Sequence, residues 1–142
     1  MRRYWQVAEA VLDYRARFME ALDRDGIDVS LSPACSLPAF THGASRDLIT
    51  AGGYAILYNV LGYPAGVVPF TRVRADEAVG RAPSRDMVEQ VALKVEQGSA
   101  GLPVGVQVVA RPWREYVALA VMGAIEREAR TQSDYPQTRV TP

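Results

Sequence analysis

The chain has 142 residues, enough for one domain, and its 16 basic and 16 acidic side chains leave no formal net charge. This balance provides no electrostatic footprint for nucleic acid or for an anionic membrane surface, so neither partner is expected. A single cysteine, Cys35, excludes an internal disulfide framework, and the absence of an apolar signal region or membrane-length run leads us to expect a cytoplasmic chain.

The N-terminal third predicts a helix, a strand and a loop. From Tyr4 to Arg24, apolar residues recur every three or four positions between charges, which is typical of an amphipathic helix, and Gly26 is suited to end it. Residues 27–31 alternate apolar and polar side chains before Pro33, which favours a short strand. Two prolines, a glycine and small polar residues then predict a loop over residues 32–47.

The middle of the chain contains an uncharged run, AILYNVLGYPAGVVPF, at residues 55–70. A helix is predicted over residues 48–61, because Gly62 and Pro64 cannot continue it. The helical repeat places four residues on one face: Ile49, Gly52, Ile56 and Val60. The run AGVVPF that follows predicts a buried strand.

The C-terminal half repeats the alternation of helix and strand. Residues 71–83 are charged and predict an exposed excursion, after which Ser84 is expected to cap a helix that ends near Gly98. The apolar run at 101–110 predicts a second buried strand, and the helical period returns over residues 113–130.

Helices that alternate with nearly continuous apolar strands indicate strands covered on both faces. We therefore expect an α/β fold, a partial sandwich with a mixed or parallel sheet of about three strands flanked by helices. Common sheets have about four to six strands, so this sheet is expected to need a partner chain or further sequence. Residues 1–130 form the predicted, incomplete domain, and residues 131–142 are predicted to be a flexible tail.

Candidate catalytic groups are few. Lys94 is the only lysine and falls on the polar side of its predicted helix, which favours a solvated surface role over that of a neutral base. Cys35 and His42 share one loop, but a free cysteine more often packs as a small hydrophobe than acts as a nucleophile. One His and one Cys do not supply a metal site, and the glycine-rich stretches lack phosphate-binding spacing, so we expect no metal and no cofactor.

Two ordered motifs carry a family resemblance. LYNVLGYPAGVVP at 57–69, followed by GLPVGVQVVARPWRE at 101–115, resembles the C-terminal part of the amidase signature family, closest to its fatty acid amide hydrolase branch. In that family the first motif ends a helix and opens a core strand, and the second opens the last strand and the last helix. The matching residues are Asn59, Pro64, Ala65, Gly66, Val67, Val68, Pro69, Gly101, Leu102, Pro103, Val104, Val106, Gln107, Pro112, Trp113 and Glu115.

The resemblance implies hydrolysis of a carboxylic amide by two serines and a lysine, which lie in a part of the family's sequence that these 142 residues do not match. No catalytic residue is therefore assigned here. The partners implied are a small-molecule amide in the complete enzyme and either the missing N-terminal amidase portion or another subunit. A noncatalytic remnant or accessory subunit that folds alone or docks on a larger amidase is the alternative, and a general aliphatic amidase or an amidotransferase subunit also remains open.

The same resemblance implies a substrate-channel role for Ile49, Gly52 and Ile56, whose shared helical face agrees with it. The alternative is that this face packs on ordinary core. Asn59, the one amide within the apolar run, is expected to be structural rather than catalytic, and to have hydrogen-bond partners because an unpaired buried amide is costly.

Overall fold

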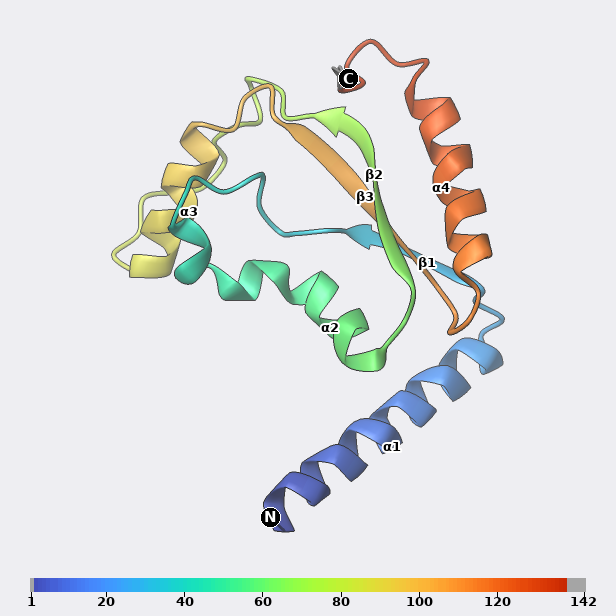
Figure 1. Cartoon of the computed structure of the whole chain (residues 1–142). Coiled ribbons are helices and arrows are strands. Elements are labelled where there is room, and N and C mark those ends of the chain that lie inside the picture. The colour runs from blue at the N-terminus through green and yellow to red at the C-terminus, as the bar shows by residue number, and fades with distance from the viewer. Residues whose placement is uncertain (1, 138–142) are drawn as a thin grey trace.

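The computed structural model describes residues 2–137. Within this range, four α-helices and two short 3-10 helices accompany one three-stranded sheet (Figure 1). The elements in chain order are α1 (Arg2–Arg24), β1 (Val29–Pro33), η1 (Ala44–Arg46), η2 (Ile49–Gly52), α2 (Gly53–Leu61), β2 (Ala65–Arg72), α3 (Met87–Gln97), β3 (Pro103–Ala110) and α4 (Glu115–Ala129).

The sheet confirms an α/β fold with three strands but corrects their direction. The order is β1-β3-β2, and both pairings with β3 are antiparallel rather than parallel. The apolar run of β3 suggested a parallel sheet because both of its faces had to be covered. Here β3 is the central strand and has layers on both faces, so its continuous hydrophobicity arises without a parallel neighbour.

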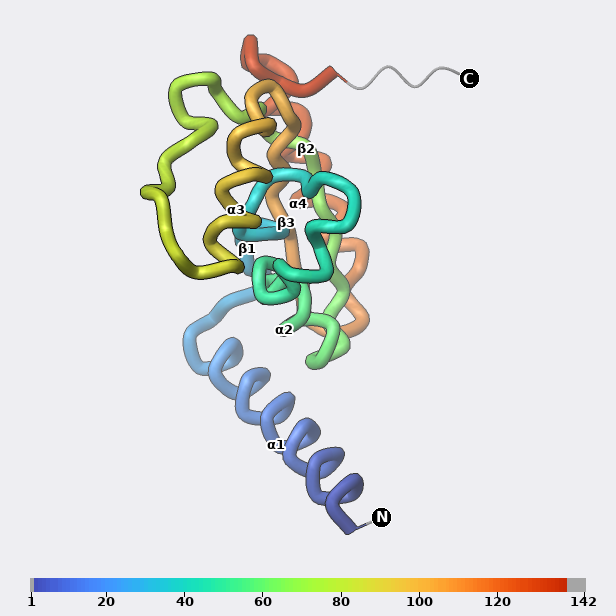
Figure 2. Tube along the Cα trace, turned by 90° about the vertical axis from the view of Figure 1, so that its left-hand side faces the viewer, coloured from blue at the N-terminus to red at the C-terminus, as the bar shows by residue number. Residues whose placement is uncertain are grey.

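Helix α4 covers one face of the sheet, and α2 with the end of α1 lies against the other (Figure 1). Val68, Val108, Ala110 and Ala118 form the buried cluster beneath α4. On the opposite face Tyr58, Leu61, Tyr63 and Val109 form a second cluster, to which α1 contributes only residues near its C-terminal end. The rest of α1 extends away from the molecule and has no buried residue (Figure 2).

Arg111 fixes the end of α1 to the end of β3. Its guanidinium donates to the backbone oxygens of Ile27, at 2.9 Å, and Leu22, at 3.1 Å, and also pairs with Asp23. These bonds satisfy carbonyl groups at and just beyond the end of the helix, where a cation is favourable to the helix dipole. The amphipathic helix predicted from Tyr4 is thus real, but only its last turns are attached.

Two predicted boundaries differ for identifiable reasons. Strand β1 runs to Pro33 instead of ending before it, because an edge strand does not need every backbone N–H for pairing. The helix predicted over 48–61 is divided into η2 and α2 at the pair Gly52 and Gly53, where glycine lowers helix propensity. Gly62 ends α2 in the left-handed conformation, at a φ of 67°, as a C-terminal glycine is expected to do.

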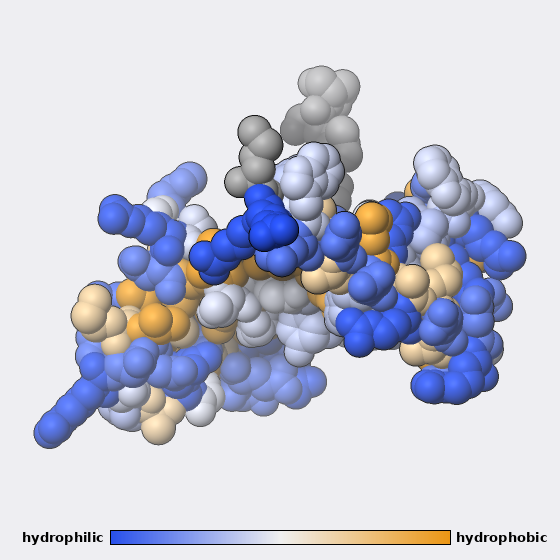
Figure 3. Space-filling model, turned by 90° about the horizontal axis from the view of Figure 1, so that it is seen from below, coloured by the Kyte–Doolittle hydropathy of each residue, from blue (hydrophilic) through white to orange (hydrophobic). Residues whose placement is uncertain are grey.

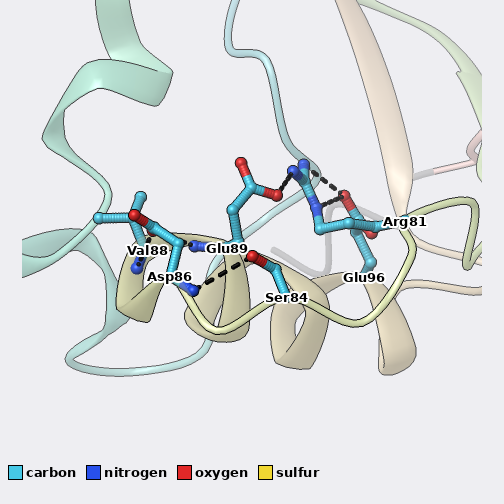
Figure 4. A network of polar contacts seen from close by, with 6 residues as sticks. All are labelled: Arg81, Ser84, Asp86, Val88, Glu89 and Glu96. Carbon is cyan, nitrogen blue, oxygen red and sulfur yellow. Dashed lines mark hydrogen bonds and ion pairs between the residues drawn. The ribbon is translucent and has the colours of Figure 1, made fainter.

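A polar network ties the excursion after β2 to α3 (Figure 4). Arg81 donates to Glu96 and pairs with Glu89, both on α3. The helix is capped by Asp86, whose carboxylate accepts from the backbone N–H groups of Val88 and Glu89 at 2.8 and 3.1 Å. The expected cap, Ser84, instead accepts from the Asp86 backbone.

Replacing Asp86 with alanine is expected to lower the free energy of unfolding by about 1 kcal/mol, because two N–H groups at the start of α3 lose their acceptor. Urea denaturation followed by far-UV circular dichroism measures the change. Asp76→Ala, at an exposed position of the same excursion, is the matched control. Equal effects of the two substitutions would contradict the capping role.

The first part of the predicted tail contacts the body of the protein. The Thr71 hydroxyl donates to the Asp134 carboxylate at 2.5 Å, and the Tyr135 hydroxyl donates to Glu126 at 3.3 Å. Pro136 is fully buried. Residues 138–142 of that predicted tail lie outside the described residues.

Candidate functional site

The predicted channel residues form an open apolar surface on η2 and α2. Ile49 is 71% exposed and Ile56 is 45% exposed, so neither contributes to the core of this chain. A Cβ atom added to Gly52 would lie 3.9 Å from Cδ1 of Ile56, which places the Ile56 side chain over the glycine. Ile49 precedes Gly52 by three residues in a 3-10 helix, where such positions align. The structure thus gathers the three residues, and their contact with substrate stays a prediction.

Side-chain hydrogen bonds hold α2 on the sheet behind this surface. Gln107 of β3 is 3% exposed and donates from Nε2 to the Ser32 hydroxyl at 3.1 Å and to the Tyr54 carbonyl at 3.4 Å. The hydroxyl groups of Ser30 and Tyr58 share a further hydrogen bond of 3.2 Å. Both serines belong to β1, and Gln107 belongs to β3. Two strands therefore hold the helix that carries the exposed face.

The buried amide is Gln107, and the expectation that the Asn59 side chain has hydrogen-bond partners is wrong. The Asn59 side chain is exposed, and no hydrogen bond joins it to any group in residues 2–137; only its backbone oxygen accepts, from Gly62 at 3.3 Å. Asn59 lies on the solvent-facing side of α2, and only the opposite side of this helix packs against the rest of the chain. Gln107 carries the same signal in the sequence, a single amide within an apolar run, but in a central strand.

The candidate catalytic residues do not come together. Cys35 is partly buried and packs against the cluster of Leu48, Ala51, Ala92 and Val95, whereas His42 is exposed in its loop. Within residues 2–137, no hydrogen bond joins these two side chains, and Lys94 lies exposed on α3. In the same range no group of three or more His, Cys, Asp or Glu residues is placed to hold a metal ion.

Two cavities adjoin the loop after β1, to which the sequence had given no functional role. One, of about 470 Å³, is lined mainly by apolar residues of the loop segment 33–40 and the start of β3. The other, of about 600 Å³, lies beside the charged residues Arg72, Glu77, Arg81 and Glu96. Both share Ser36, Leu37, Pro38 and Val104 as walls, so we describe them together as the groove.

Comparison with known proteins places the two motifs in context. The sequence model of the amidase family, described as Amidase, matches residues 1–119. This chain belongs to the amidase family. As the resemblance led us to expect, the motif at 57–69 ends a helix, α2, and opens β2, and the motif at 101–115 opens β3 and α4.

The relatives that match this amidase include two fatty acid amide hydrolases and a putative amidase. It is 38% identical over 128 residues to fatty acid amide hydrolase 1 of Caenorhabditis elegans, covering 86% of this chain and 22% of the relative. It is 35% identical over 129 residues to fatty-acid amide hydrolase 1 of Sus scrofa, with 88% and 22% covered. A putative amidase of Schizosaccharomyces pombe is 30% identical over 125 residues, with 85% and 23% covered.

The amidase chain therefore spans about a fifth of the length of the relatives it matches, in their C-terminal portion. None of the helices described between residues 2 and 137 has the length and apolar character needed to cross a membrane.

Proposed function

We propose that this chain forms the C-terminal part of an amidase that hydrolyses carboxylic amides of the fatty acid type. The match to fatty acid amide hydrolases over 22% of their length supports the proposal. The nucleophile and its base are assigned to the remaining portion of the domain. The observation that carries the proposal is the family match over residues 1–119.

In this proposal the chain contributes structure and one wall of the acyl channel. The exposed face of Ile49, Gly52 and Ile56 is apolar. Because Gly52 has no side chain, an alkyl chain has room to lie along this face. Small-molecule sites are commonly apolar with few polar groups, as an acyl chain requires. The Gln107 network serves to hold this wall at a fixed position on the sheet.

Complementation tests the proposed function. The chain is co-expressed with the portion of the C. elegans fatty acid amide hydrolase that lies before the matched segment, and hydrolysis of oleamide to oleic acid and ammonia is measured. Turnover is expected only when both are present, with each expressed alone as a control. Turnover by the chain alone that is lost in Cys35→Ala or Lys94→Ala would overturn the proposal. A complex without turnover would favour a noncatalytic accessory subunit.

Gly52→Phe is expected to lower kcat/KM for oleamide in that complex by at least about tenfold, because an aromatic ring beside Ile56 would project from this face into the path of the acyl chain. Hydrolysis of butyramide, whose acyl chain is too short to reach far along the wall, should change little. Thr50→Phe, at an exposed neighbouring position off this face, is the matched control. Equal losses for the long and the short amide would contradict a channel wall.

A further inference from the structure

Helix α4 is apolar around most of its circumference. Residues 116–125, YVALAVMGAI, carry no charge over about three helical turns. One side packs on the sheet through the buried Ala118 and four partly buried neighbours, Val117, Val121, Met122 and Ile125. The other side faces away from the sheet, and no other helix or strand of residues 2–137 lies over it (Figure 1). A surface helix is normally polar on its outer side, so this side of α4 indicates an interaction surface.

The residues on the outer side follow the spacing of a helix–helix seam. Tyr116, Ala120, Gly123 and Arg127 succeed one another at intervals of four, three and four positions, which is the repeat along which two helices pack in a coiled coil. Leu119 lies beside this line of residues. Tyr116 is 67% exposed and Leu119 is 65% exposed, although both are large and mainly apolar. We call these five residues the α4 face.

The α4 face is complementary in shape to a reversed copy of itself. Its first half carries the bulky Tyr116 and Leu119, whereas its second half contains Gly123, where an added Cβ would meet only Nη1 of Arg127, at 4.0 Å. An antiparallel copy sets each bulky half against the other open half. The seam spacing then places Tyr116 level with the partner's Arg127, and Ala120 level with the partner's Gly123. Small residues at the centre allow two helices to approach closely.

The charges of α4 favour the same antiparallel arrangement. Glu115 opens the helix and Arg127 lies near its end, and neither side chain has an ion-pair partner within residues 2–137. A reversed copy brings these opposite charges to the same end of the interface and sets the Arg127 guanidinium against the ring of the partner's Tyr116. It also aligns the two helix dipoles favourably. A parallel copy would instead place the two Arg127 side chains together.

We infer that α4 pairs with α4 of a second copy of this chain, antiparallel, about a two-fold axis between Ala120 and Gly123. Such an interface is isologous, since the same face is used by both copies. A different group of hydrophobic residues lies open at the end formed by η2 and α3, on the left of Figure 3. That group includes Ile49 of the proposed channel wall and is left to that site. The pairing of α4 does not depend on the proposed function.

The seam is short, so the association is expected to be weak. Interfaces below the standard size are typical of transient contacts, and we expect a dissociation constant of at least about 1 µM. Below that concentration the chain is monomeric. Substitutions on the α4 face therefore act on association and leave the unfolding of the monomer nearly unchanged.

Sedimentation equilibrium over a series of chain concentrations tests the pairing. Leu119→Glu should raise the dissociation constant of the dimer by at least about tenfold, because a charge would be buried without a partner. Leu12→Glu is the matched control, the same change at a position of α1 that is 64% exposed. It should alter the constant by less than about twofold, as expected for a surface site outside the contact.

Disulfide formation tests the direction of the two helices. Chains carrying Tyr116→Cys are mixed with equal amounts of chains carrying Arg127→Cys, both with Cys35→Ala, and the products of air oxidation are identified by mass spectrometry. The mixed dimer should exceed each symmetric dimer by at least about fivefold, since a disulfide requires Cβ atoms about 4 Å apart. Glu128→Cys in place of Arg127→Cys is the control, because Glu128 is exposed but lies off the α4 face. This second mixture should give no such excess.

Each contrary outcome identifies what is wrong. A chain that stays monomeric at every concentration, or symmetric disulfides in excess, would overturn the inference. Equal weakening by Leu119→Glu and Leu12→Glu would place the contact on α1 and overturn it as well. If Leu119→Glu instead released the co-expressed C. elegans portion, the remaining domain would be what covers α4, and the proposed function would still stand. Failure of complementation by a chain that dimerises as expected would overturn the proposed function alone.

Discussion

Leu61→Ala is expected to lower the free energy of unfolding by about 2 to 5 kcal/mol, the usual cost of a cavity at a fully buried leucine. Leu61 has no exposed surface and lies at the end of α2 in the cluster with Tyr58, Tyr63 and Val109. Phe18 and Leu22 of α1 pack on the same cluster. The cavity would therefore open where α1, α2 and β3 meet. Native domains are stable by about 5 to 15 kcal/mol, so this single change removes a large share.

Urea denaturation of the purified chain, followed by far-UV circular dichroism, measures this loss. The matched control is Leu119→Ala, the same chemical change at a position of α4 that is 65% exposed. It should alter the free energy of unfolding by less than about 0.5 kcal/mol, as surface substitutions usually do. Similar losses for the two variants would mean that the cluster around Leu61 is not a core.

Gly105→Ala is expected to destabilise the sheet by about 1 to 3 kcal/mol, the typical cost of overpacking. Its added Cβ would lie 2.6 Å from Cγ1 of Val67 and 3.1 Å from the backbone oxygen of Val68, on the neighbouring strand. A β-branched side chain and a paired backbone have little freedom to move aside. Gly105 also pairs with Pro69, next to the irregularity between Pro69 and Thr71, so a displaced strand would disturb the register there.

Gly66→Ala provides the comparison, because its Cβ would meet Sδ and Cε of Met122 at 2.5 and 2.9 Å. These atoms end a flexible side chain, so the methionine can change rotamer and the cost should be smaller than at Gly105. Thermal unfolding of the two variants measures the difference. A larger loss for Gly66→Ala would show that Met122 is held more tightly than the β2 backbone.

Local patterns in the sequence were sufficient to predict most elements. Periodicity is a property of a short segment and can be read directly from the sequence. It predicted the helices at residues 4–24 and 113–130, and the apolar runs predicted β2 and β3. Strand direction is different in kind, because it depends on how the connections cross the sheet. Nothing within β3 itself distinguishes a central antiparallel strand from a parallel one.

The site was less predictable than the fold because its features arise between distant segments. The face of Ile49, Gly52 and Ile56 follows from spacing along one stretch, and the structure does gather it. The choice between Asn59 and Gln107 as the buried amide depended on which element had cover on both sides. The pairing of Glu96 with Arg81 joins residues fifteen positions apart along the chain, which no local pattern predicts.

The position of β3 constrains the order of events during synthesis. Strands β1 and β2 do not pair with each other in this sheet; each pairs only with β3, which begins at Pro103. About 70 residues separate the end of β1 at Pro33 from the start of β3 at Pro103, so β1 and β2 stay unpaired in this sheet until β3 has been synthesised. Such delayed, non-local pairing is slow and prone to aggregation, and makes chaperone dependence an expected property of this chain during translation.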